Sequence, residues 1–104
     1  MVKKINQKEF LENKNEFIVL DFYADWCGPC KMTAPILEEV SNEASFNKIS
    51  FCKVNVDEED DLATKFNVQA IPTLVFLKNG AEIGRKMGFT PKVGLVNWIN
   101  DLIK

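Results

Sequence analysis

The sequence predicts an α/β fold in which helices cover both faces of a mixed sheet of about five strands, giving a three-layer sandwich. Three strand-length runs are apolar at almost every position, which is typical of strands buried on both faces. Amphipathic helical segments separate these runs, and an Asn-Gly pair predicts a closing hairpin. With 104 residues, we expect a single domain, 1–104, that is large enough for a hydrophobic core without disulfide or metal support.

The first half of the chain predicts strands and helices in alternation. Residues 2–5 read as a short opening strand and residues 6–14 as a short helix. Residues 17–24 (FIVLDFYA) are rich in β-forming side chains and predict a central strand. Over residues 29–44, apolar side chains recur at helical spacing, although Pro35 removes one backbone hydrogen bond inside this helix. Such a βαβ opening predicts parallel strands.

The second half predicts a further strand, a short helix, a hairpin and a final helix. Residues 49–56 (ISFCKVNV) are a second central strand, and residues 62–68 a short helix that follows an acidic run. Residues 73–80 form a third strand that ends at the Asn-Gly turn, from which residues 81–88 return antiparallel. Residues 91–104 are an amphipathic helix whose opening proline suits a first turn.

Composition excludes several classes of protein. The formal net charge is −2 and no basic stripe is present, so we expect no nucleic-acid partner. No apolar run approaches the ~20 residues needed to cross a bilayer, and we expect no membrane partner. The charged N-terminus lacks the apolar core of a signal peptide, which predicts a cytoplasmic protein.

Two of the three cysteines, Cys27 and Cys30, enclose only Gly28 and Pro29. A structural zinc site needs four ligands, yet the chain has no histidine and only Cys52, inside an apolar strand, remains. A structural disulfide is also disfavoured, because so short a loop removes little entropy from the unfolded chain. In a reducing compartment, a close pair of this kind favours redox chemistry.

The position of the pair predicts different roles for its two sulfurs. The pair lies between a buried strand and the start of a helix, where backbone N–H groups and the helix dipole lower a thiol pKa. We expect Cys27 to be the more exposed sulfur and the attacking nucleophile. Cys30, one helical turn further on, is expected to be shielded and to act as the resolving thiol.

Two charged residues on the predicted central strands complete this hypothesis. Strand alternation places Asp21 on a buried face, where desolvation raises a carboxyl pKa toward neutrality and suits proton exchange with a thiol. The alternative is an aspartate at a strand end that binds loop amides; proximity to the cysteines favours the functional role. Lys53 either forms a partly buried ion pair that moderates Asp21 or extends its ammonium group to solvent.

The motif WCGPCK, the aspartate six residues before its first cysteine, and IPT leading into LVFLKNG resemble the thioredoxin family over essentially the whole chain. The resemblance implies the thioredoxin fold, with four helices around a five-stranded sheet of order 1-3-2-4-5. It also implies a general protein-disulfide reductase in which the Cys27 thiolate attacks a substrate disulfide and Cys30 resolves the mixed disulfide. The Cys27–Cys30 bridge would be reduced again by a thioredoxin reductase, a flavoprotein that draws on NADPH. We expect the chain to bind no cofactor, to act on oxidised proteins and to be a monomer.

The resemblance also assigns roles to individual residues. Asp21 matches the acid that exchanges protons with the resolving cysteine, Lys53 its neighbouring lysine, and Pro72 the cis-proline that faces the dithiol. Ile71 would offer its backbone to an extended substrate segment. The remaining substrate-binding residues would form a flat apolar surface around the dithiol: Trp26, Gly28, Pro29, Ala70, Met87, Gly88 and Phe89.

Two rival functions and one extra thiol stay open at this point. A disulfide oxidant or isomerase could use the same fold, although the Gly-Pro pair between the cysteines favours a reductant. A binding module with an incidental dithiol is the second rival, but a pure binder does not need both cysteines and Asp21. Cys52 is an additional cysteine, which we expect to be a buried, unreactive apolar residue.

Overall fold

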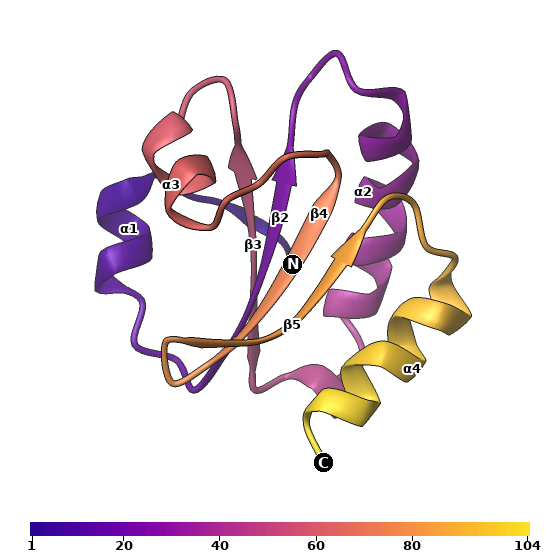
Figure 1. Ribbon diagram of the computed structural model, residues 1–104. Coiled ribbons are helices and arrows are strands. Elements are labelled where there is room, and N and C mark those ends of the chain that lie inside the picture. The colour runs from indigo at the N-terminus through magenta and orange to yellow at the C-terminus, as the bar shows by residue number, and fades with distance from the viewer.

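The computed structural model describes all 104 residues and contains a five-stranded sheet of order β1-β3-β2-β4-β5. Helices cover both faces, with α1 and α3 on one side and α2 and α4 on the other (Figure 1). No helix has both the length and the apolar character needed to cross a membrane. The elements are β1 (Lys3–Lys4), α1 (Gln7–Glu12), β2 (Phe17–Tyr23), α2 (Gly28–Ser41), a 3₁₀ helix (Ala44–Phe46), β3 (Ile49–Asn55), α3 (Asp60–Lys65), β4 (Thr73–Lys78), β5 (Ala81–Met87) and α4 (Lys92–Leu102). This is the thioredoxin fold that the resemblance implies.

Connection length decides the strand directions. β2 pairs with β3 in parallel, because α2 carries the chain back across the sheet between them. β4 is antiparallel to both β2 and β5. The tight turn between β4 and β5 uses Asn79 and Gly80, which both have positive φ angles of 51° and 84°. These are the residue types that such hairpin turns require, so the predicted Asn-Gly turn is confirmed.

Alternation along β2 supplies side chains to two separate cores. Val19 packs with Leu37 in the core beneath α2 and α4. Leu20 and Phe22 point the other way, into the core beneath α1 and α3. All three β2 side chains are completely buried, as predicted for a strand that helices cover on both faces. The sheet is therefore a rigid platform for the loops at its ends.

Three helix boundaries differ from the sequence prediction. α2 ends at Ser41, and a separate 3₁₀ helix follows it within the range predicted as one helix. α3 begins at Asp60, because the acidic residues occupy its first turn, where the helix dipole favours them. Pro91 is the N-cap of α4 and precedes its first turn.

Candidate active site

The cysteine pair lies at the junction between β2 and α2, and its two sulfurs form a disulfide. Cys27 is the N-cap of α2, and its Sγ accepts a hydrogen bond from the backbone N–H of Cys30 at 3.2 Å. Gly28 and Pro29 form the first helical turn, and both are exposed. A proline in this turn is well tolerated, because its missing N–H has no helical partner to lose. The loop thus points the Cys27 sulfur at one backbone N–H in the first turn of α2, a position that stabilises a thiolate.

The exposure of the two cysteines differs less than expected. Cys27 is 5% exposed and Cys30 is 3% exposed, so both are buried in the disulfide state. Cys27 is therefore the more exposed of the two, as expected, but only by a small margin, since both cysteines pack with Ala24. The asymmetry lies instead in the hydrogen bonding, because the Cys27 sulfur receives the helix N–H.

Asp21 is buried beneath α2, with 2% of its surface exposed. It follows Val19 on the same face of β2, the face toward which Cys30 points from α2. Its Oδ1 has no hydrogen-bond partner, so the alternative of a strand-end aspartate bound to loop amides is wrong. Burial raises the pKa of this carboxyl to about 7, and the charge of Lys53 lowers it by a smaller amount. Near neutral pH, the group can both accept and return a proton.

Lys53 lies directly beside Asp21 in the parallel ladder of β2 and β3. The two side chains form no ion pair, so this form of the prediction is wrong. The Lys53 Nζ instead lies 5.6 Å from the centre of the Tyr23 ring, in a cation–π arrangement. Lys53 therefore affects the Asp21 pKa through its charge, without a direct hydrogen bond.

The loop before β4 lies against the disulfide. The Ile71–Pro72 peptide is cis, as the resemblance implies. The Sγ of Cys27 lies 3.8 Å from the carbonyl oxygen of Ile71, which brings the two segments together at the site. The Pro72 carbonyl accepts a hydrogen bond from Gly88 N–H at 2.8 Å, so the loop after β5 is tied to the same edge. Three segments distant in sequence thus meet at the cysteines.

Comparisons with known proteins agree with this geometry. The Thioredoxin family model matches residues 1–101. The chain is 42% identical over 105 residues to thioredoxin of Haemophilus influenzae, covering 98% of this chain and 97% of that protein. It is 41% identical over 100 residues to thioredoxin of Bacillus subtilis, covering 96% and 95%. The chain belongs to the thioredoxin family. The structure of a thioredoxin from Malassezia sympodialis matches it with a TM-score of 0.89 at 35% identity, over 98% of this chain and 90% of that one.

Membership of the thioredoxin family, together with the Cys27–Cys30 bridge, makes this chain a protein-disulfide oxidoreductase.

The side chains around the bridge form an exposed apolar surface. Trp26 is 70% exposed, Met87 65% and Phe89 41%, although large apolar side chains are normally buried. Ala70 is also exposed, while Ile71 and Gly88 are half-buried.

A cavity of about 200 Å³ opens beside Trp26, and we call it the docking cavity. It is lined by Trp26, Val56, Ala63, Val68, Gln69, Ala70 and Ile71. Sequence reasoning found Trp26, Ala70 and Ile71 but missed the rest. Val56 follows β3, and Ala63 and Val68 come from α3 and its end, so only the folded chain brings them to Trp26. The Trp26 Nε1 donates to Asp57 at 2.9 Å, which fixes the indole against this cavity. Asp57 is the first residue of the acidic run, for which the sequence predicted no partner.

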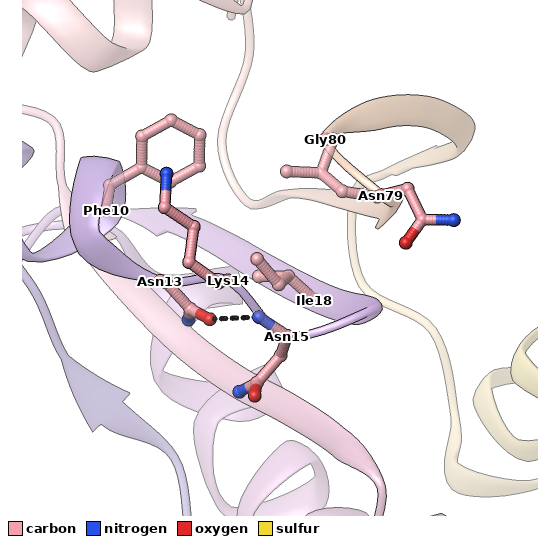
Figure 2. Close-up of a pocket in the computed structure, with 8 residues that line it drawn as sticks. Phe10, Asn13, Lys14, Asn15, Ile18, Asn79 and Gly80 are labelled. Atoms are coloured by element: carbon pink, nitrogen blue, oxygen red, sulfur yellow. Dashed lines mark hydrogen bonds between the residues drawn. The ribbon is translucent and has the colours of Figure 1, made fainter.

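The larger cavities lie elsewhere, away from the disulfide. One of about 310 Å³ lies near the turn between β4 and β5 (Figure 2). Its lining holds Lys14 and three asparagines but no cysteine or carboxylate, and Asn13 Oδ1 there accepts from Asn15 N–H at 3.1 Å. A second cavity, of about 370 Å³, borders Cys52, which is 2% exposed, and burial raises the pKa of its thiol. Cys52 is therefore buried, as the sequence predicts, and its raised pKa disfavours the reactive thiolate.

Proposed function

We propose that this chain is a general protein-disulfide reductase whose working pair is Cys27 and Cys30. One observation carries the proposal: a disulfide at a helix N-terminus lies beside an exposed apolar surface and a cavity large enough for a substrate side chain. The surface supplies non-specific apolar contacts, which suit a reductase that acts on many proteins. The buried Asp21 supplies a proton acceptor on the face of β2 toward which Cys30 points.

The reaction proceeds by two thiol–disulfide exchanges. The Cys27 thiolate attacks one sulfur of a substrate disulfide, and the other substrate sulfur leaves as a thiolate that takes up a proton. Cys30 then loses its proton to Asp21 and attacks the Cys27 sulfur, so the mixed disulfide breaks and the second substrate thiolate leaves. The substrate gains two electrons, and the chain is left with the Cys27–Cys30 bridge. Trp26 and Ile71 hold the substrate segment, and Lys53 keeps Asp21 partly ionised.

The oxidised bridge must be reduced again for the next cycle. We propose that a thioredoxin reductase, a flavoprotein that uses NADPH, supplies these electrons and that the chain itself binds no cofactor. We also propose that it acts as a monomer in the cytoplasm. The reducing conditions there would keep the three cysteines as thiols when the active-site bridge is open. The half-buried Gly88, which is hydrogen-bonded to the buried Pro72, would border the surface that both the reductase and protein substrates use.

The reductase function is tested with insulin as the disulfide substrate. In the presence of NADPH and a bacterial thioredoxin reductase, the chain should catalyse insulin reduction, measured as NADPH oxidation. The pre-reduced chain alone should reduce insulin once, with formation of the Cys27–Cys30 bridge. Equilibration with glutathione measures the reduction potential of that bridge. A potential as oxidising as that of glutathione would contradict the reductase function and favour an oxidant or isomerase.

Filling the docking cavity should weaken substrate binding and leave the chemistry unchanged. Ala63→Leu adds apolar volume where a substrate side chain would lie, so the half-saturating insulin concentration should rise about tenfold, the equivalent of losing about 1.4 kcal/mol of apolar burial. The limiting rate of oxidation of the pre-reduced chain should not change. Thr64→Leu, at an exposed position on the same helix, is the matched control. Equal effects of the two substitutions would show that the cavity does not bind substrate.

A further inference from the structure

β5 contains a bulge that puts two oppositely charged side chains on one face. In the ladder with β4, Glu82 lies opposite Leu77 and Arg85 opposite Val75, so Ile83 is the extra residue. Residues three apart in a regular strand face opposite sides, and one extra residue cancels that difference. Val75 and Leu77 both belong to the core beneath α1 and α3. Glu82 and Arg85 therefore both face α3.

The Arg85 guanidinium joins β5 to the end of α3. Its Nε and Nη2 donate to the two carboxylate oxygens of Glu82, at 2.8 and 2.9 Å. Nη2 also donates to the backbone carbonyl of Phe66 at 2.5 Å, and Nη1 to that of Asn67 at 3.4 Å. The Arg85 side chain is 27% exposed, so these bonds are partly shielded from water. Such a planar fork can hold several acceptors at fixed positions, which a lysine cannot do.

α3 is only six residues long, and so short a helix is stabilised mainly by its contacts with the rest of the fold. Asn67 has a left-handed φ of 51°, and the N–H of Val68 closes the turn onto Ala63 at 2.9 Å. These backbone bonds use helical carbonyls, so the carbonyls of Phe66 and Asn67 are left for Arg85. The next residue is Val68, which lines the docking cavity.

We propose that Arg85, oriented by Glu82, is a positioning residue for substrate binding that fixes the Val68–Ile71 wall of the docking cavity. The inference rests on the proposed reductase function. Arg85 makes no hydrogen bond to either cysteine, so it acts on the shape of the cavity and leaves the thiol exchange unaffected. Its loss therefore weakens binding of protein substrates that fill the cavity, and spares small disulfides that do not.

The test compares Arg85→Met with the unchanged protein as the pre-reduced chain is oxidised by insulin or by bis(2-hydroxyethyl) disulfide. Trp26 fluorescence follows the formation of the bridge. We expect the half-saturating insulin concentration to rise about fivefold, equivalent to the net loss of one hydrogen bond. The limiting rate and the rate with the small disulfide should stay unchanged. Hydrogen exchange at the Val68 amide should accelerate about tenfold, while amides of β2 keep their protection.

Two further variants separate positioning from general effects of charge. Lys86→Met removes the same charge from the neighbouring residue of β5, which contacts Trp98, and should change neither measurement. Arg85→Lys keeps the charge but not the fork, and should give an intermediate insulin value. The proposal would be overturned if Arg85→Met left the half-saturating insulin concentration unchanged, or if it weakened the reaction with both disulfides equally. If the unchanged protein reduced neither disulfide, the reductase function would fail, and exchange at Val68 would still decide whether Arg85 holds this segment.

Discussion

Replacing Cys30 with serine is expected to stop multiple turnover while leaving the first attack on a substrate disulfide intact. Serine is uncharged at neutral pH and a poor nucleophile toward sulfur, so the mixed disulfide at Cys27 cannot be resolved from within the chain. Turnover with NADPH and thioredoxin reductase should fall at least about 1,000-fold. The trapped species should be visible by mass spectrometry as the chain plus its substrate, joined through Cys27.

Two other cysteine variants make this result specific. Cys27→Ser should lose turnover without trapping any substrate, because the attacking sulfur is absent. Cys52→Ala should keep full turnover, since Cys52 packs in the core beneath α1 and α3, on the other face of the sheet from α2. Substrate trapped at Cys30 in the Cys27→Ser variant, or unchanged turnover of Cys30→Ser, would reverse or remove the assigned roles.

The sequence predicted those features that depend on local patterns. Apolar side chains at consecutive positions of residues 17–24 predicted a strand buried on both faces, and alternation within it predicted the buried face of Asp21. The spacing of Cys27 and Cys30, with no histidine in the chain, predicted a redox pair and disfavoured a zinc site. Each of these inferences needed only a few neighbouring residues, and the structure agrees with the predicted burial of Asp21 and Cys30.

Features that depend on distant contacts were not predictable in this way. The docking cavity is formed by Val56, Ala63 and Val68 together with Trp26, which belong to different segments of the chain. The Trp26–Asp57 hydrogen bond has the same origin. Neither isomer of an Ile-Pro bond is fixed by its own sequence, since the two differ by only about 0.5–1 kcal/mol. The bulge in β5 had one local signal, because Gly84 is a glycine inside a strand.

Asp21 links the stability of the protein to pH, because the folded state holds its proton more tightly than the unfolded chain. Its pKa rises from 3.8 to about 7 on folding. Between these two values the folded state binds more protons, so the free energy of unfolding falls as the pH rises. Above about pH 7 the carboxyl is ionised in both states, and the full cost of burying its charge lowers the free energy of unfolding. About three pH units at 1.36 kcal/mol each give a penalty of about 4 kcal/mol for the ionised carboxylate.

Asp21→Ala should therefore stabilise the oxidised protein by about 3 kcal/mol at pH 8, after a small cost for the cavity that it leaves, and by almost nothing at pH 4. Urea unfolding at both pH values measures this difference. Asp25→Ala, at an exposed position, should change stability by less than about 0.5 kcal/mol at either pH. A gain for Asp21→Ala that was equal at pH 4 and pH 8 would rule out ionisation as its cause. The same variant should resolve mixed disulfides more slowly near neutral pH, because Cys30 loses its proton acceptor. A variant that is more stable but slower would show that the chain keeps a destabilising carboxylate for its chemistry.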